Sequence, residues 1–156
     1  MIWQIVIYLF FLIIGVTLGS FYTLAIYRIP LKQDITHTRS YCPKCNHRLE
    51  FLDLIPVLSY IFLKGKCRYC KNKISKRYIL IEITSGILYL LLVMSLKISF
   101  LNITMQNIVT LLYVTLIYSA IFIFIGILKE TKKMSKSVLV FGLIVQILYI
   151  IYLCIL

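Results

Sequence analysis

Acidic residues are scarce in this chain of 156 residues, where 5 aspartates and glutamates stand against 17 lysines and arginines and leave a formal net charge of +12. In a soluble protein that imbalance suggests a nucleic-acid partner. Here, however, 62% of the residues are hydrophobic and the mean hydropathy is +0.98, whereas a soluble domain is about 45–50% apolar. The composition therefore predicts a protein of the lipid bilayer with basic loops, and no nucleic-acid partner.

Charge is also missing from the N-terminus, because the first charged residue is Arg28. A cleaved secretion signal carries a basic segment before its apolar stretch, and this chain has none. We identify no low-complexity segment, internal repeat or Ser/Gly linker. Residues 1–27 are therefore interpreted as a retained span, ending where Pro30 cannot continue a helix and Arg28 can reach the interface.

Four apolar runs are each near the roughly 20 residues that a spanning helix needs. They cover residues 1–27, 79–96, 106–128 and 137–156. Only Glu82 interrupts the second run. The polar stretch before the third run predicts an outside turn near residues 97–105.

The basic residues predict the orientation of these spans. Residues 28–78 hold 12 lysines and arginines against three acids, residues 129–136 hold four lysines against one acid, and the turn at 97–105 holds only Lys97. Cytoplasmic loops are enriched in lysine and arginine. We expect an all-α polytopic protein of the cytoplasmic (inner) membrane, with both basic segments in the cytoplasm and both termini outside.

Four of the five cysteines form two C-x-x-C pairs in the long loop, Cys42/Cys45 and Cys67/Cys70, with 21 residues between the pairs. In such knuckles backbone N–H groups turn toward the sulfurs while the thiolates converge on one ion, and zinc is the natural occupant of a four-sulfur site. Four thiolates complete the coordination, so the predicted zinc is structural. The fold expected is thus four transmembrane helices with a zinc-ribbon-like cytoplasmic loop between the first and second.

Disulfides, redox activity and free thiols are the alternatives to metal. A reducing cytoplasm disfavours disulfides, and a redox pair needs only one C-x-x-C. His37 and His47 are interpreted as solvated loop residues, because four sulfurs leave them no ligand position. Cys154, alone in the last apolar run, is expected in the helix core.

Two further segments have predicted structural roles. Residues 51–63 are apolar, too short to span and broken by Pro56, so we expect them at the membrane interface or packed under the helices. Gly15 and Gly19 lie four residues apart, a spacing that lets two helices approach closely in lipid. A chemical role for the neighbouring Ser20 is the alternative.

In these segments the sequence resembles the N-terminal domain of the type IV prepilin peptidase family. The similar stretches run in order over about residues 15–90: Gly15 to Phe21, Arg28-Ile29-Pro30, Ser40 to Cys45, Asp53 to Tyr60, Lys64 to Cys70, Ile74 to Tyr78 and Ile81-Glu82-Ile83. The family consists of inner-membrane enzymes that cleave the leader of prepilins and pseudopilins. They also methylate the new N-terminal amine with S-adenosylmethionine. The resemblance implies a prepilin or pseudopilin N-terminal segment as the partner, presented at the cytoplasmic face.

The sequence departs from the family where the protease should be. The family's protease needs two aspartates that share protons around an attacked water. Gly126 stands where the first is expected, no Gly-x-Gly-Asp motif follows, and Asp34 and Asp53 are the only aspartates. We therefore expect no leader cleavage by this chain alone.

Glu82 and Asp53 remain the catalytic candidates, both weak. An ionised group within a span normally faces a partner or a cavity. Glu82 is expected either to pair with Lys76 and Arg77 or to hold a substrate or cofactor, such as a cationic amine. Asp53 is expected to begin a turn rather than to catalyse.

Three hypotheses follow. The chain acts in prepilin processing by docking substrate and by methyl transfer; it is a non-catalytic adaptor that binds a pilin-like segment or a second peptidase chain; or its zinc loop only stabilises the bundle.

Overall fold

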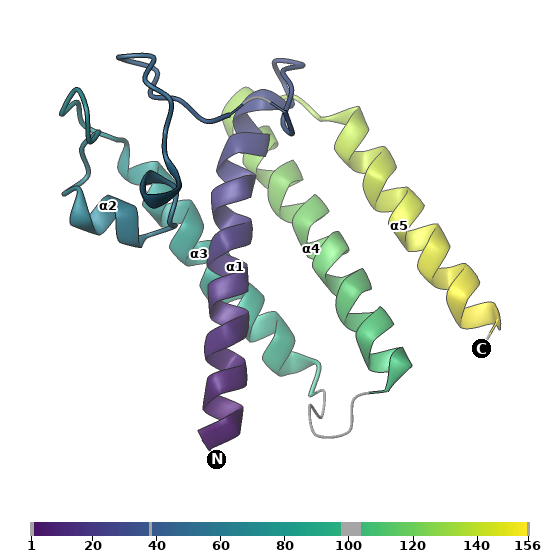
Figure 1. Cartoon of the computed structure of the whole chain (residues 1–156). Coiled ribbons are helices and arrows are strands. Elements are labelled where there is room, and N and C mark those ends of the chain that lie inside the picture. The colour runs from purple at the N-terminus through teal and green to yellow at the C-terminus, as the bar shows by residue number, and fades with distance from the viewer. Residues whose placement is uncertain (1, 38, 98–103, 156) are drawn as a thin grey trace.

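Four long helices carry the fold (Figure 1). The structure, a computed structural model, describes residues 2–37, 39–97 and 104–155. The long helices are α1 (Ile2–Arg28), α3 (Lys76–Ser95), α4 (Met105–Thr131) and α5 (Lys136–Ile155). Each is long and apolar enough to cross a membrane, so the predicted all-α polytopic architecture is confirmed. Between α1 and α3 lie two short elements, the 3-10 helix η1 (Phe51–Asp53) and α2 (Leu58–Phe62).

The long helices extend past some limits of the apolar runs. α3 begins at Lys76, where the Ser75 hydroxyl accepts a hydrogen bond from the Arg77 N–H. α4 continues to Thr131, so it includes part of the predicted basic loop at 129–136. Hydropathy marks the part of a helix that faces lipid, while lysine and arginine are good helix formers that carry the helix onward. The outside turn expected near 97–105 falls mainly on residues outside the described part of the chain.

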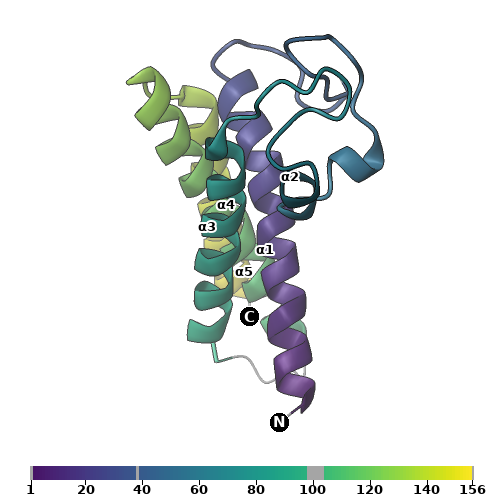
Figure 2. The same ribbon diagram turned by 90° about the vertical axis from the view of Figure 1, so that its left-hand side faces the viewer.

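The four helices run alternately up and down (Figure 1). The long segment between α1 and α3 and the short connection between α4 and α5 lie at one end of the bundle, here called the loop end. Figure 2 shows the same segment from the side, gathered over the α1–α3 pair and away from α5. The four-cysteine segment therefore belongs to one half of the bundle.

Small residues let α1 and α3 approach closely. A Cβ added to Gly15 would lie 2.8 Å from the Tyr89 Cβ, and one added to Gly19 would lie 2.8 Å from the Ser85 Cβ. The Ser85 hydroxyl, fully buried, donates a hydrogen bond of 2.8 Å to the Gly15 carbonyl. The glycine pair thus serves helix packing, as its spacing predicts. The Ser20 hydroxyl forms no hydrogen bond in the described part of the chain, and the Ser20 carbonyl accepts from the Thr23 hydroxyl.

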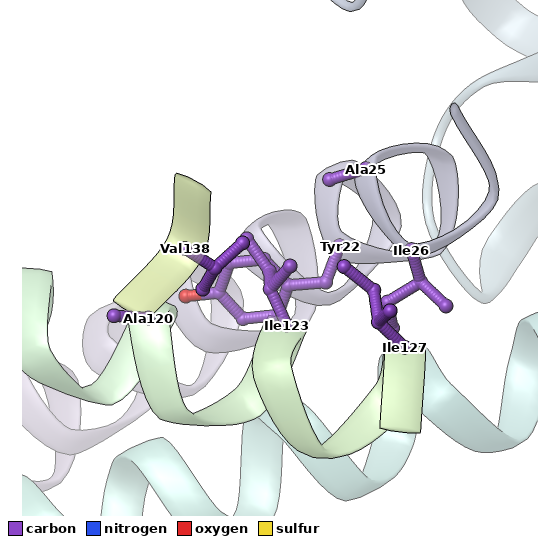
Figure 3. Close-up of a cluster of buried hydrophobic side chains, with 7 residues drawn as sticks. All are labelled: Tyr22, Ala25, Ile26, Ala120, Ile123, Ile127 and Val138. Atoms are coloured by element: carbon purple, nitrogen blue, oxygen red, sulfur yellow. The ribbon is translucent and has the colours of Figure 1, made fainter. Parts of the chain in front are cut away.

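The main buried cluster joins α1 to α4 near the loop end (Figure 3). Its members are Tyr22, Ala25 and Ile26 of α1, Ala120, Ile123 and Ile127 of α4, and Val138 of α5. The Tyr22 hydroxyl lies 2.6 Å from the Ser119 hydroxyl, and Tyr118 donates to the Ser85 carbonyl at 3.0 Å. Hydroxyl bonds of this kind hold helices together where lipid offers no polar partner.

α5 packs mainly on α4 and exposes most of its surface. The Tyr113 hydroxyl of α4 donates to the Gln146 side-chain oxygen at 2.6 Å, and Tyr113 stacks on Tyr149 with ring centroids 3.8 Å apart. Cys154 is exposed on this helix. The expectation that Cys154 lies in the core was wrong, because hydropathy does not distinguish a face turned to lipid from one turned to another helix.

Candidate metal centre

The first cysteine pair lies in a tight knuckle built by the backbone. The Cys42 N–H donates to the His47 carbonyl at 2.9 Å, and the Asn46 N–H donates to the Cys42 carbonyl at 2.8 Å. Asn46 has a φ of 54°, a left-handed conformation that asparagine adopts more readily than most residues. An antiparallel bridge between Tyr41 and Arg48 closes the turn.

The second pair lies in an equivalent knuckle. The Cys67 N–H donates to the Asn72 carbonyl at 2.8 Å, and the Lys71 N–H donates to the Cys67 carbonyl at 3.1 Å. Lys71 has a φ of 58°, and an antiparallel bridge joins Lys66 to Lys73. Hydrogen bonds from Leu49 to Ser40 and from Ile74 to Gly65 extend both knuckles in the same way.

The two knuckles are a local repeat with an offset of 25 residues, which takes Cys42 to Cys67 and Cys45 to Cys70. Sequence reading identified no internal repeat, and this was wrong. The signal was present, since Ser40–Leu49 and Gly65–Ile74 share their cysteines, a base at the ninth position and an aliphatic residue at the tenth. Ten residues with so few identities are visible as a repeat only when the cysteines are aligned.

The four sulfurs converge at one point. All four ligand atoms of Cys42, Cys45, Cys67 and Cys70 lie within 4.8 Å of one another, and the Cys42 and Cys70 sulfurs are 3.9 Å apart. Zn–S bonds of about 2.3 Å in a tetrahedron place sulfurs roughly 3.8 Å apart. Cys42 and Cys67 are buried, whereas Cys45 is exposed. The four residues therefore fit a tetrahedral metal ion held by sulfur alone, with no ligand position left for substrate.

The electrostatics of the cluster favour a cation. Backbone N–H groups of Cys45 and Lys44 point at the Cys42 sulfur and lower the pKa of Cys42 to about 7. At Cys70 the N–H of Asn72 alone would lower the pKa, but burial and the neighbouring sulfurs outweigh it and raise the pKa of Cys70 to about 11. Four adjacent thiols cannot all ionise without a positive charge among them. A divalent metal supplies that charge, and all four sulfurs then bind as thiolates.

Asp53 attaches the second knuckle to η1. Its carboxylate accepts a hydrogen bond of 2.6 Å from the Arg68 side chain and one of 3.4 Å from the Tyr69 hydroxyl, while its side chain is only 3% exposed. Burial alone would raise the pKa of Asp53, but the Arg68 hydrogen bond and charge, with the Glu50 N–H, lower it. Asp53 was expected to begin a turn, but it is the last residue of η1, and its carboxylate accepts a hydrogen bond of 3.2 Å from the Glu50 N–H at the start of that element. Sequence reading missed the tie to Arg68.

Glu82 attaches the loop to α3. Its carboxylate accepts a hydrogen bond of 2.7 Å from the Val57 N–H, and the residue is 9% exposed. Val57 has a φ of 62° and a ψ of −51°, and the Leu58 N–H donates to the Pro56 carbonyl at 2.6 Å. This is a γ-turn with positive φ, a strained conformation for a β-branched residue. The carboxylate thus holds a backbone that would not adopt this turn readily by itself.

The pairing expected for Glu82 was wrong. In the described part of the chain Glu82 forms no ion pair with Lys76 or Arg77, and Arg77 instead pairs with Glu130 at the end of α4. Arg77 lies in the first turn of α3, at the loop end, where the end of α4 brings Glu130 within reach. No signal in the sequence identifies Val57 as the partner, because a backbone N–H is present at nearly every residue.

Neither histidine belongs to the four-cysteine cluster: His47 lies beside it, and His37 lies in the turn around Asp34. The His47 ring stacks on Tyr69 with centroids 3.5 Å apart, so it connects the two knuckles from outside the sulfur cluster. The His37 N–H donates to Asp34, whose carboxylate also accepts from the Thr36 N–H. The Thr36 N–H, outweighing burial, lowers the pKa of Asp34.

Gly126 packs against α1. A Cβ at this position would lie 2.7 Å from the Ile26 Cγ1 and closer still to the Ile26 Cδ1. Ile26 belongs to the main buried cluster shown in Figure 3. An aspartate here would displace Ile26 and place a carboxyl group among aliphatic side chains.

The fold and the site define a multi-pass membrane protein with a four-cysteine centre between its first two long helices. Residues 13–96, just over half of the chain, match the model of the bacterial peptidase A24 N-terminal domain. The chain therefore belongs to the family of this domain. The matched region contains all four cysteines, Asp53 and Glu82.

Several curated relatives carry the name prepilin leader peptidase/N-methyltransferase, among them proteins of three different bacteria. The protein of Myxococcus xanthus is 42% identical over 80 residues, covering 51% of this chain and 24% of the relative. The Vibrio cholerae protein is 43% identical over 82 residues (47% and 32%), and the Bacillus subtilis protein is 46% identical over 77 residues (49% and 31%). The chain thus matches only about a quarter to a third of the length of these relatives. No solved structure matches the chain.

Proposed function

We propose that this chain acts in the processing of prepilins or pseudopilins by docking the substrate's N-terminal segment at its metal-bound loop, without cleaving the leader by its own residues. The observation that carries the second part is that Gly126, packed against Ile26, stands where the resemblance places the first protease aspartate. The two aspartates support it further, because Asp34 and Asp53 occupy separate turns and each is bound to its own partners.

The metal is proposed to be zinc, held by Cys42, Cys45, Cys67 and Cys70. When bound, it supplies structural cross-linking and no open position for chemistry. The two knuckles then act as a clamp: the chain between them, η1 and α2, is held at both ends. Asp53 and Glu82 attach this chain to the second knuckle and to α3, so their proposed roles are positional rather than catalytic.

The protein is proposed to lie in the inner membrane with its loop end facing the cytoplasm and both termini on the other side. The 12 lysines and arginines of residues 28–78 support this orientation. A substrate helix anchored in the same membrane would then present its N-terminal end at the level of the clamp.

Methyl transfer from S-adenosylmethionine to the substrate's N-terminal amine is proposed as a reaction to which the loop contributes. The names of the relatives support it, since they combine leader peptidase with N-methyltransferase. The experiment incubates the purified chain with isotopically labelled S-adenosylmethionine and two synthetic pilin-like segments, one with its leader and one without. Mass spectrometry of the peptides measures cleavage and methylation together.

We expect binding of the segment, methylation of the leaderless peptide and no cleavage. Cys42→Ser should abolish binding, while Cys154→Ser, which changes a cysteine outside the cluster, should not. Binding without methyl transfer would support a non-catalytic adaptor, and a pull-down would then test a second peptidase chain as its partner. Equal binding by the Cys42→Ser variant would leave the loop with a stabilising role alone, and cleavage would contradict the proposal.

A further inference from the structure

The segment between the knuckles has a surface unlike the rest of the loop. Eight large hydrophobic side chains between Ile29 and Ser75 are exposed in the described residues, and six of them lie within residues 51–63. These six are Phe51, Leu52, Leu54, Leu58, Ile61 and Phe62, with Phe51 81% exposed and Phe62 79% exposed. We call residues 51–63 the apolar hairpin.

The charges of the loop are arranged around this hairpin. None of the 12 bases of residues 28–78 falls inside it; Arg48 precedes it and Lys64 follows it. Its one charged residue, Asp53, is buried against Arg68. Exposed bases thus lie near both ends of this apolar surface, with the acid Glu50 directly before its first residue. Apolar side chains with bases nearby have the pattern of an element lying in a membrane interface, with the apolar side chains among acyl chains and the bases among phosphates.

The depth of the hairpin follows from its attachment to Glu82. Glu82 lies six residues after the start of α3, about 9 Å along the helix axis at 1.5 Å per residue. On α1 its neighbour is Gly19, whose Cβ would lie 2.9 Å from the Glu82 Cα, and Gly19 precedes the end of α1 by nine residues, about 14 Å. The Cα of Glu82 therefore lies well below the loop end of both helices, and Val57 lies within reach of its side chain.

The views agree with this depth. Figures 1 and 2 both show α2 beside α1 and α3 and below their loop ends, rather than above them. Helices that lie in an interface bury their apolar face roughly 5–10 Å below the headgroup boundary. The exposed apolar side chains of the hairpin thus belong to a segment that lies beside the two spans and not above them.

We propose that the apolar hairpin is immersed in the leaflet on the loop side, that lipid acyl chains cover Phe51 and Phe62, and that the Glu82–Val57 bond holds the hairpin at this depth. The two knuckles of the metal clamp then lie at the membrane surface, and the hairpin that connects them lies in the leaflet. The strained turn at Val57 immediately precedes α2, which runs across the side of the bundle rather than along it (Figures 1 and 2), the direction expected of a helix lying in a membrane interface.

The test uses the full chain, metal-loaded and reconstituted in vesicles of phosphatidylethanolamine and phosphatidylglycerol. Trp3 is the one tryptophan, so Trp3→Phe provides a background without indole. Phe51→Trp and Phe62→Trp then report from the two ends of the hairpin, and Tyr41→Trp, at an exposed residue of the first knuckle, is the matched control. Retention of one zinc per chain shows that each variant is folded.

Each variant is measured with lipids brominated near the headgroup end of the acyl chains and, separately, with acrylamide in the water. We expect the brominated lipids to quench the Phe51→Trp and Phe62→Trp variants and acrylamide to quench the Tyr41→Trp variant. Acrylamide quenching of all three alike would place the hairpin in water and overturn the proposal. Protection of the hairpin variants from both quenchers would mean that protein covers this face, which also overturns it.

The part played by Glu82 is tested in the Phe62→Trp background. Glu82→Ala should shift the emission to longer wavelength and raise acrylamide quenching, because the hairpin is released toward water. Glu82→Gln keeps an oxygen that can accept from Val57 and should leave both readings nearly unchanged. Unchanged readings in the Glu82→Ala variant would contradict Glu82 as the residue that sets the depth.

Discussion

The bundle has two halves, the pair α1 and α3 and the pair α4 and α5, and the helices of each pair pack in a different way. α1 and α3 meet at Gly15, Gly19 and Ser85 and carry the whole four-cysteine loop. α4 and α5 meet through large side chains such as Tyr113 and Tyr149, and only Val138 and Val145 of α5 are buried. α1 and α3 approach closely at the two glycines, and on this pair of helices a bonded carboxylate and a strained turn position the loop. The family match ends at residue 96, between the two halves.

Removal of the metal should produce the largest difference between the halves. Binding of zinc to a four-cysteine site is worth about 10–16 kcal/mol at neutral pH, so a strong chelator or Cys42→Ser should unfold residues 39–75. Limited proteolysis should then cleave this segment, while far-UV circular dichroism of the helices stays nearly unchanged. Acid should act in the same direction, since lowering the pH protonates the thiolates and releases metal.

Cys154→Ser is the control for metal removal, because Cys154 lies on α5 outside the cluster. It should retain one zinc per chain by native mass spectrometry. A four-cysteine loop that resists protease equally with and without metal would contradict the clamp.

Loss of the Glu82 carboxylate should lower the free energy of unfolding by more than loss of a polar group in the α4–α5 half. Glu82→Ala removes a bond to a charged acceptor, worth about 1.5–3 kcal/mol, and leaves the Val57 N–H without its partner. Gln146→Ala removes a bond between Tyr113 and a neutral amide, and such bonds between membrane helices average about 0.6 kcal/mol. Thermal unfolding in detergent measures both variants, and equal losses would remove the distinction between the halves.

A methyl group should be tolerated differently at two glycines. Gly19→Ala places a Cβ 2.9 Å from the backbone of α3 and should destabilise the chain by about 1–3 kcal/mol through overpacking, less the helix propensity gained. Gly142→Ala meets only the Ala120 Cβ at 3.7 Å and should stabilise it by up to about 1 kcal/mol. The same detergent assay compares them, and a stabilised Gly19→Ala variant would show that α1 and α3 have room to separate.

The smallest effect is expected where the halves are joined by charge. Arg77 of α3 pairs with Glu130 of α4, and both side chains are partly exposed. Exposed ion pairs contribute about 0.2–1 kcal/mol and are screened by salt. Glu130→Gln should therefore lower the unfolding temperature slightly at low salt and not at high salt. A large loss at both salt concentrations would show that this pair, rather than the α1–α4 cluster, holds the halves together.

The four-cysteine cluster was predictable because its signal is local. Each C-x-x-C pair closes within a few residues, and thiolate chemistry limits the occupants. The attachments of the loop were not predictable. From the sequence, Asp34, Glu50 and Asp53 are all possible ion-pair partners of Arg68. Only the path of the chain between the knuckles places Asp53 beside it. Glu82 was identified as a costly charge within a span, but its partner is a backbone N–H 25 residues away in the sequence.

The sequence by itself determined the number of long apolar helices, the class of protein and the four cysteines of the cluster, because hydropathy and short cysteine spacings act over a few residues each. Tertiary structure alone decided which helices pair, which carboxylate holds which part of the loop, and that Gly126 lies against Ile26. Those features depend on the close approach of α1 to α3 and of α1 to α4. Such an approach is set by the summed shapes of whole helix faces, and no short stretch of the chain contains it.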